Sequence, residues 1–294
     1  MKKMFLLRLA CISCMLLQLT TAYATVFTVA NSSDAGAGSL RQAITDANAS
    51  AGSHTINFNS STTYTINLVS ELPALARQIT IDGTTAQGGL VDINGSSLTS
   101  GNGIYLSPTA LLSVVKGLYL HSFGLGSGVF VDAADGVEIR NCVLSGNKYG
   151  VSTYAPAFPV ADPLNNLIIA DNKVGTNVGG TAAMGNTQFG IVCAGGGSTY
   201  NNITISGNLV SGNTFHGIMI EANNSLVSGN KIGTDVTGLN AIPNAIGLDI
   251  RGDKVTADNN LISGNNGPGI SVIRDNHIIT RCKIGVNITS DAIL

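Results

Sequence analysis

Charged side chains are scarce in this 294-residue chain. Lysine and arginine total 15, aspartate and glutamate total 17, and the formal net charge is -2. Only 11% of the residues are charged, against about 25% in an average soluble domain. Such a chain lacks the basic surface that binds nucleic acid or anionic membranes. Tryptophan is absent, but 44% of the residues are hydrophobic, which suffices for a core and argues against disorder.

Long hydrophobic runs are missing after residue 24. The apolar run at residues 9–19 follows the positive charges of Lys2, Lys3 and Arg8, and the small-x-small triplet 22–24 comes after it. This pattern predicts an export signal peptide at residues 1–24. The run has roughly half of the ~20 residues that span a bilayer, which disfavours a membrane anchor. We therefore expect an exported protein without membrane insertion, located in the periplasm, at the outer surface or outside the cell.

Cysteine is also rare. Two of the five cysteines, Cys11 and Cys14, lie in the predicted signal peptide, with too little apolar chain before them for a lipoprotein signal. The other three, Cys142, Cys193 and Cys282, are an odd number, so at least one thiol is unpaired. They fall in different copies of the repeat described below. We expect them to fill valine or isoleucine positions as small hydrophobes; a disulfide or a metal site is the alternative.

One substantial helix is predicted, after a short alternating strand at residues 25–29. Ser39 and Gln42 have the spacing of a capping box. An apolar stripe at helical spacing follows and consists of Leu40, Ala43, Ile44 and Ala47. A stack of strands has an open end with apolar side chains and unpaired backbone groups, and we expect this helix to cover that end. A partner-binding helix is the alternative.

The same segment carries a family resemblance. Residues 37–44, Ala-Gly-Ser-Leu-Arg-Gln-Ala-Ile, followed by Asp-Ala-Asn at 46–48, resemble the CSLREAI motif of many exported bacterial right-handed parallel β-helix proteins of pectate-lyase-like architecture. Residues 79–84 are similar to the same proteins. Gly38 stands where the motif has cysteine, so any role of that thiol is absent here. The resemblance covers nearly all of the mature chain and implies the fold; it says little about function, because many such proteins have no known role.

A repeat occupies most of the remaining chain, and each copy begins with a glycine and a short apolar strand. The starting glycines are Gly103, Gly128, Gly150, Gly190, Gly217, Gly247 and Gly269. The short spacing, near 22 residues, suits one turn of a three-sided coil. Glycine and asparagine are too frequent for a helical solenoid, and a β-sandwich does not explain a recurring Ser-Gly-Asn corner.

The predicted fold is all-β: one right-handed, single-stranded parallel β-helix, or solenoid, with one N-terminal capping helix. The strand and helix occupy residues 25–54, and about eight or nine coils occupy residues 55–294. Stacked corners place equivalent asparagines about 4.8 Å apart, close enough for an amide ladder. The ladder candidates are Asn147, Asn172, Asn208, Asn230 and Asn265.

Insertions that begin at residues 174, 232 and 284 have similar sequences. We expect the first two to protrude from one edge of the coil. The sequence stops within the third, which predicts either an end-to-end partner chain at the last coil or a truncated member of a longer family.

Outward-facing side chains of the glycine-led strands are the candidates for function. Stacking places Glu221 beside Arg251, one coil apart and near Asp249, and these three are the candidate catalytic residues. An exposed salt bridge is the structural alternative. An aromatic patch two or three coils away supplies glycan-binding candidates, which are Tyr105, Phe130, Asp132 and Tyr154.

The predicted function is non-catalytic: an extended exported surface for binding or adhesion, with a polysaccharide or cell-surface glycan as the partner. The alternative is an enzyme acting on acidic polysaccharides, a lyase, hydrolase or epimerase, which needs a base and a group that stabilises negative charge. No metal site or other cofactor is predicted, since the histidines are isolated. A weak calcium site at Asp235 and Asn230 stays open, although the calcium-roll nonapeptide is absent.

Overall fold

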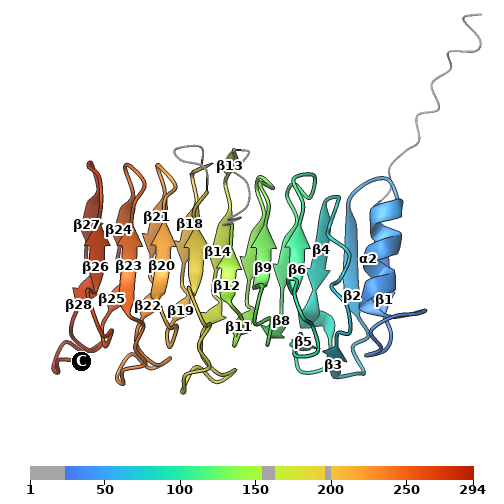
Figure 1. The fold of residues 1–294 in the computed structure, drawn as a ribbon, viewed down its shortest axis with the longest axis horizontal. Coiled ribbons are helices and arrows are strands. Elements are labelled where there is room, and N and C mark those ends of the chain that lie inside the picture. The colour runs from blue at the N-terminus through green and yellow to red at the C-terminus, as the bar shows by residue number, and fades with distance from the viewer. Residues whose placement is uncertain (1–23, 154–162, 196–199) are drawn as a thin grey trace, which may run out of the picture.

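The computed structural model describes residues 24–153, 163–195 and 200–294, so the predicted signal peptide lies almost wholly outside the described residues. The strands form three long sheets of ten, nine and seven strands. Figure 1 shows them stacked along one axis, with a single helix at the N-terminal end. Neighbouring strands in each sheet run parallel, as β20 and β23 do with Met219 opposite Asp249. The all-β, parallel β-helix prediction is confirmed.

Sheet A has ten strands and includes the predicted N-terminal strand at its edge. Its members in spatial order are β1 (Thr25–Val29), β2 (His54–Phe58), β4 (Ile79–Asp82), β7 (Val114–Lys116), β10 (Glu138–Arg140), β14 (Ile168–Ala170), β18 (Thr204–Ser206), β21 (Leu226–Ser228), β24 (Thr256–Asp258) and β27 (Ile278–Thr280).

Sheet B has nine strands, many of them only two residues long. They are β3 (Tyr64–Asn67), β5 (Val91–Asn94), β8 (Leu118–His121), β11 (Val143–Ser145), β15 (Lys173–Val174), β19 (Leu209–Val210), β22 (Lys231–Ile232), β25 (Leu261–Ile262) and β28 (Lys283–Ile284). The 3-10 helix η1 (Gly83–Thr85) follows β4.

Sheet C has seven strands and contains the strands that follow the predicted starting glycines. They are β6 (Ile104–Leu106), β9 (Ser127–Val131), β12 (Tyr149–Ser152), β16 (Ile191–Cys193), β20 (His216–Ile220), β23 (Ile246–Ile250) and β26 (Ile270–Val272). A separate two-stranded sheet pairs β13 (Leu164–Asn165) with β17 (Tyr200–Asn201).

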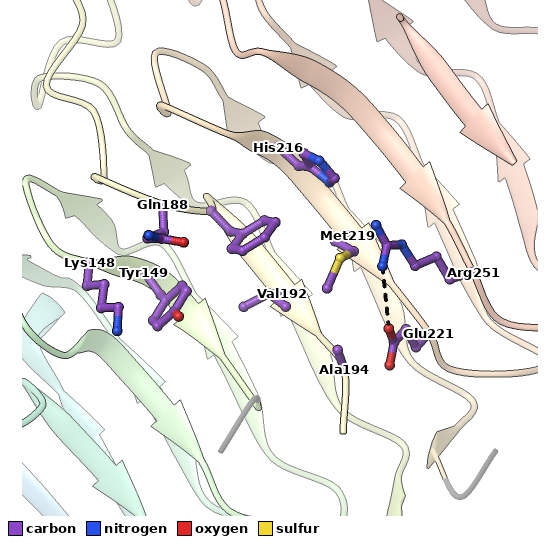
Figure 2. Close-up of a pocket in the computed structure, with 10 residues that line it drawn as sticks. Lys148, Tyr149, Gln188, Val192, Ala194, His216, Met219, Glu221 and Arg251 are labelled. Atoms are coloured by element: carbon purple, nitrogen blue, oxygen red, sulfur yellow. Dashed lines mark ion pairs between the residues drawn. The ribbon is translucent and has the colours of Figure 1, made fainter. Parts of the chain in front are cut away.

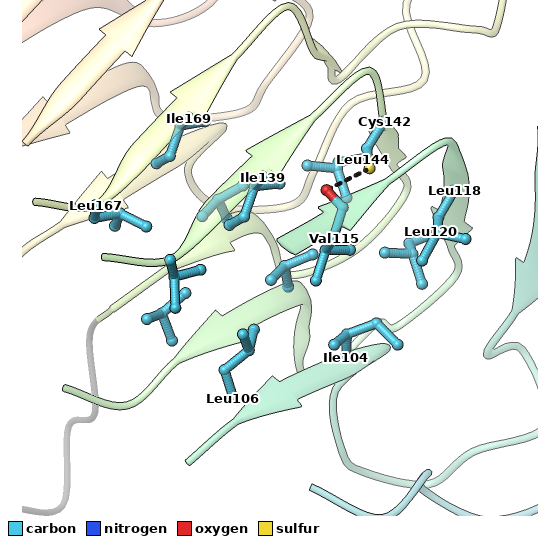
Figure 3. Close-up of a cluster of buried hydrophobic side chains, with 14 of the residues drawn as sticks. Ile104, Leu106, Val115, Leu118, Leu120, Ile139, Cys142, Leu144, Leu167 and Ile169 are labelled. Atoms are coloured by element: carbon cyan, nitrogen blue, oxygen red, sulfur yellow. Dashed lines mark hydrogen bonds between the residues drawn. The ribbon is translucent and has the colours of Figure 1, made fainter. Parts of the chain in front are cut away.

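The core lies inside the coil, between the three sheets. Alternation along each strand sends every second side chain inward, so that Val115, Ile139 and Ile169 occupy matching positions on successive strands of sheet A. All three are fully buried. Figure 3 shows this column facing Leu120 and Leu144 of sheet B. Like side chains therefore meet between neighbouring coils, as the repeat predicts.

Helix α2 (Leu40–Ala49) covers the N-terminal end of the stack against β1 and β2. Its buried residues are the predicted stripe, Leu40, Ala43, Ile44 and Ala47. The Ser39 hydroxyl accepts a hydrogen bond from the backbone N–H of Gln42, as predicted. The capping box is only half formed, because the Gln42 side chain donates to Asp46 at 2.7 Å and the backbone N–H of Ser39 donates to Gly36 instead.

Two asparagine ladders are present, and the prediction of a single one was wrong. The first lies at the corner between sheets A and B and contains Asn172, Asn208, Asn230 and Asn260. The second lies between sheets B and C and contains Asn147, Asn186, Asn213, Asn244 and Asn265. The triplet Ser-Gly-Asn occurs at both corners, so the sequence pattern merged members of two ladders.

The cysteines occupy two kinds of position. Cys193 is fully buried opposite Ile220, the aliphatic position that was predicted. Cys142 and Cys282 also pack with the apolar core, but the predicted valine or isoleucine position was wrong for both, since they stand at the two ends of the first ladder. The backbone N–H of Cys142 donates to Asn172 Oδ1 at 2.9 Å, and Cys282 Sγ lies 3.7 Å from Asn260 Nδ2. The three thiols are free.

The matching insertions protrude from one edge, as predicted, and stack on each other (Figure 1). The backbone N–H of Val236 in the second loop donates to Gly180 of the first at 2.8 Å, and Ile288 of the third donates to Gly238 of the second at 3.0 Å. At the C-terminal end of the stack, Ile278 and Ile284 are about half exposed. No helix in the described parts of the chain is long and apolar enough to cross a membrane.

Candidate functional site

The strand register of sheet C produces the outward column that the repeat predicts. Its aligned members are Tyr105, Phe130, Ser152, Val192, Met219, Asp249 and Ser271. The centre of this column is not open to solvent, however. Val192, Met219 and Asp249 are 0%, 7% and 2% exposed. Tyr149, Ala194 and Phe189 pack with Val192 and Met219 in a second apolar cluster on this outer face, and Asp249 contacts His216 and Arg251.

A depression of about 570 Å³ lies on this face, over β12, β16, β20 and β23. Figure 2 shows Lys148 and Tyr149 at one end and Glu221 and Arg251 at the other. Its lining residues come from these four strands and the positions that flank them: Lys148, Tyr149, Gln188, Phe189, Val192, Ala194, His216, Met219, Glu221 and Arg251. We call this depression the sheet C pocket.

Aromatic rings form one wall of the sheet C pocket. Tyr149 and Phe189 are stacked with ring centroids 6.0 Å apart, and Phe189 meets the edge of His216 at 5.1 Å. Each of the three directly precedes a strand-starting glycine: Gly150, Gly190 and Gly217. Register therefore stacks them in one column, and that position in the repeat is the sequence signal that would have revealed Phe189 and His216.

At the other end of the sheet C pocket, polar contacts link His216, Asp249, Arg251 and Glu221 in that order. Arg251 Nε lies 2.7 Å from Asp249 Oδ2, and His216 Nδ1 lies 3.3 Å from the same oxygen. Arg251 also approaches Glu221, with Nη1 and Oε1 4.0 Å apart. The structure thus brings the predicted neighbours Glu221 and Arg251 together. It adds His216, which the sequence pattern did not predict.

Burial separates the roles of these residues. The Asp249 side chain is 2% exposed, whereas Glu221 and Arg251 side chains are 32% and 38% exposed. Burial alone would raise the pKa of Asp249, but His216 and Arg251 outweigh it, and the net pKa lies below its usual value. Asp249 is therefore an ionised anchor that orients Arg251 and His216; it cannot itself contact a ligand in the pocket.

The predicted aromatic patch is partly assembled, next to the pocket on β6 and β9. The rings of Tyr105 and Phe130 lie 5.3 Å apart, and the Tyr105 hydroxyl donates to Asp132 at 2.7 Å. Partial burial and the Asp132 carboxylate raise the pKa of Tyr105 to about 12, so the phenol stays a neutral donor. Tyr154, the fourth candidate, lies outside the described residues.

The candidate calcium ligands are engaged elsewhere. Asp235 Oδ1 accepts from the backbone N–H groups of Gly238 and Leu239 within its own loop, and Asn240 Nδ2 donates to the other oxygen. Asn230 belongs to the first ladder. Within the described residues, no three His, Cys, Asp or Glu side chains converge as metal ligands.

A solved structure and a protein family are similar to this chain. The crystal structure of an alginate lyase from Paenibacillus sp. str. FPU-7 is similar at a TM-score of 0.38 and 13% identity, over 87% of this chain and 99% of that one. No curated protein matches the sequence. The profile of the family described as "Right handed beta helix region" matches residues 42–232. This match spans more than half of the chain, and the protein therefore belongs to the right-handed β-helix family.

Proposed function

We propose that the protein is exported and binds glycans at the sheet C pocket. The observation that carries this proposal is the combination of a ring wall, Tyr149 and Phe189, with the exposed pair of Glu221 and Arg251. Apolar walls with a few fixed polar groups are typical of small-ligand sites. Ring faces pack against the C–H faces of a sugar. The carboxylate accepts hydrogen bonds from the sugar hydroxyls, and the guanidinium donates hydrogen bonds to them.

Electrostatics favour neutral hydroxyl recognition at the Arg251 end of the pocket. The positive charge of Arg251 is balanced by Asp249 at 2.7 Å and approached by Glu221 at 4.0 Å. These three side chains therefore carry no excess positive charge that would attract an anion. Their oxygen and nitrogen atoms still present directional hydrogen-bonding groups, held in place by the buried anchor Asp249.

The test is calorimetric titration with glycans selected on an array from cello-, xylo- and manno-oligosaccharides and oligouronates. Phe189→Ala and Arg251→Ala are each expected to weaken binding by at least about 10-fold, the loss typical of a central contact. Arg140→Ala is the matched control, because Arg140 Nε pairs with Glu138 two residues away at 2.7 Å with similar exposure, but on sheet A. Equal losses in Arg140→Ala and Arg251→Ala would contradict the proposal, as would an absence of any bound glycan.

Cleavage of an acidic glycan is the second candidate, and the contact of His216 with buried Asp249 favours it. A carboxylate that holds an imidazole in place is a common arrangement for a general base. In eliminative cleavage the base removes the C5 proton of a uronate, the C4–C5 double bond forms, and the C4–O bond breaks as the leaving oxygen takes up a proton. Hydrolysis is less favoured because it needs two accessible carboxyl groups, and Asp249 is buried.

An ultraviolet assay for the unsaturated product distinguishes binding from cleavage. If the site is catalytic, oligouronates yield product with the unaltered protein, and His216→Ala abolishes it while binding persists. Product formation that continues at the same rate in His216→Ala would exclude His216 as the base. With no product from any oligouronate, the binding function stands alone.

A further inference from the structure

The two ends of the sheet C pocket differ in charge balance. Lys148 precedes β12 and Arg251 follows β23, and three strand spacings separate β12 from β23 in sheet C. With about 4.8 Å between neighbouring strands, Lys148 and Arg251 are offset by roughly 14 Å along the coil axis. The register that aligns Ser152 with Asp249 also separates them by about six residues, roughly 20 Å, along the strand direction. Figure 2 shows Lys148 beside Tyr149 at one end and Arg251 beside Glu221 at the other.

Lys148 is the uncompensated cation of the pocket. Within residues 24–153, 163–195 and 200–294, no carboxylate lies within ion-pair distance of its ammonium group. Its Nζ instead lies 5.2 Å from the centroid of the Tyr149 ring, a cation–π contact that holds the charge at the rim and leaves its donors free. Arg251, in contrast, is balanced by Asp249.

Hydrogen bonds on both sides fix the backbone position from which the Lys148 side chain extends. Its N–H donates to the carbonyl oxygens of Phe123 at 2.9 Å and Gly126 at 3.0 Å, and its own carbonyl accepts from Gln188 at 2.9 Å. Between the two ends the floor is apolar, with Val192, Ala194 and Met219. A bound chain therefore meets one free positive charge, at the β12 end.

We propose that the glycan ligand is acidic, and that it crosses sheet C diagonally with a carboxylate or other anionic substituent at Lys148 and neutral hydroxyls at Glu221 and Arg251. This inference rests on the proposed glycan-binding function and names its ligand class and orientation. The uncompensated ammonium group of Lys148 would pair with one anionic group of the ligand, two coils from Glu221 and three coils from Arg251.

The test compares acidic oligosaccharides with their own neutral forms. Tetragalacturonate and tetramannuronate, and each of them after reduction of the carboxyl groups, are titrated at low salt into the unaltered protein and into Lys148→Ala, Lys148→Arg and the control Lys116→Ala. Lys116 is a lysine of sheet A whose charge is paired with Asp82 at 2.8 Å. The acidic forms are expected to bind about 3- to 5-fold more tightly than the reduced forms, as for one exposed charge pair.

The variants separate this inference from the function on which it rests. Lys148→Ala is expected to abolish the preference for the acidic form, measured as the ratio of the two affinities within each variant, whereas Lys148→Arg and Lys116→Ala keep the preference. Equal affinity for both forms in the unaltered protein, or a preference that survives in Lys148→Ala, overturns the inference while glycan binding stands. If neither form binds, the proposed function fails and the inference fails with it.

Discussion

Arg251 Nε lies 2.7 Å from Asp249 Oδ2, and the two residues are two positions apart at the end of β23. The Asp249 side chain is 2% exposed and the Arg251 side chain is 38% exposed. The buried partner thus fixes the exposed one. A free arginine side chain loses rotamer freedom when it binds a ligand. Anchored by Asp249, Arg251 has already lost much of that freedom, which preorganises the sheet C pocket.

This relationship predicts that Asp249→Asn weakens glycan binding although Asp249 touches no ligand. The amide cannot offer the charged oxygen that Arg251 Nε and His216 approach. We expect an affinity loss of about 3- to 10-fold and a stability loss of about 1–3 kcal/mol, the usual cost of breaking a buried charged hydrogen bond. Calorimetric titration and urea unfolding measure the two effects.

The control for this prediction is Glu138→Gln, the equivalent change next to Arg140 on sheet A, where the acidic partner is about one third exposed. Glu138→Gln is expected to leave glycan binding unchanged and to alter the free energy of unfolding by less than about 0.5 kcal/mol. An Asp249→Asn variant that binds glycan as tightly as the unaltered protein would show that the anchor is dispensable.

The asparagine ladders are predicted to contribute strongly to stability. Asn208 is 1% exposed; its Oδ1 accepts from Asn172, and its Nδ2 donates to Ile169 and Asn230. Asn208→Ala leaves several of these buried groups unpaired, and we expect a loss of about 2–4 kcal/mol. The urea midpoint measures it.

Asn266 provides the comparison for the ladder, because its side chain is exposed at the coil surface. Asn266→Ala is expected to change stability by less than about 0.5 kcal/mol. Should both variants lose the same amount, the ladder is not a special source of stability.

The fold was predictable because its signals repeat. Period-2 alternation and glycine-led strands recur along the stack, so each copy reinforces the same register, and β1 matches the strand predicted at residues 25–29. The ladders were harder to predict, because one triplet serves two corners and only the hydrogen bonds separate Asn147 from Asn172.

The candidate site was predictable only in part. Register alone placed Glu221 beside Arg251. It could not show that Asp249 is buried, because Asp249 contacts Arg251 and His216, and His216 stands directly before Gly217, outside the positions that the pattern assigns to the outer face. Phe189 was overlooked for the same reason. Charge compensation at Arg251 and its absence at Lys148 are also properties of three-dimensional placement.

Thiol chemistry tests the placement of the three cysteines. Burial raises the pKa of both the Cys142 and the Cys193 thiols to about 12, so neither forms the reactive thiolate in the native state. Cys282 is partly exposed at the ladder end. In a chain that begins at Thr25, a colorimetric thiol reagent is expected to modify Cys282 alone, with the other two reacting only after unfolding. Rapid native labelling of Cys142 or Cys193 would contradict this placement.

Extension of the first ladder by one member is a further prediction. Asn260 Nδ2 faces the weak acceptor Cys282 Sγ at 3.7 Å, and asparagine at position 282 offers an amide oxygen instead. We expect Cys282→Asn to stabilise the protein by about 0.5–1.5 kcal/mol, the net value of one hydrogen bond, whereas Cys282→Ala gives no gain. Urea unfolding compares the two variants, and equal midpoints for both would contradict the assignment of position 282 to the ladder.

Acid stability is predicted to depend on Asp235 in the second protruding loop. Burial alone would raise the pKa of Asp235, but hydrogen bonds from Asn240, Thr237 and the backbone of Asn240 and Leu239 lower it to about 2. A carboxyl whose folded pKa lies below its unfolded value of about 3.9 stabilises the fold above that value, and this contribution is lost as the pH falls from about 4 towards 2. Part of the acid destabilisation of the loop therefore belongs to this one group.

The repeat itself supplies the variant that tests this assignment. Asparagine occupies the position equivalent to Asp235 in the first and third loops, where Asn177 and Asn287 accept backbone hydrogen bonds with Oδ1. Asp235→Asn should therefore retain the loop at pH 7, within about 1 kcal/mol, and remove its share of the acid dependence between pH 4 and 2. Asp235→Ala removes the acceptor altogether and should cost about 1–3 kcal/mol at pH 7. Hydrogen exchange of the Gly238 and Leu239 amides, followed against pH, reports on this loop directly; an unchanged pH profile in Asp235→Asn would show that other carboxyl groups control its acid sensitivity.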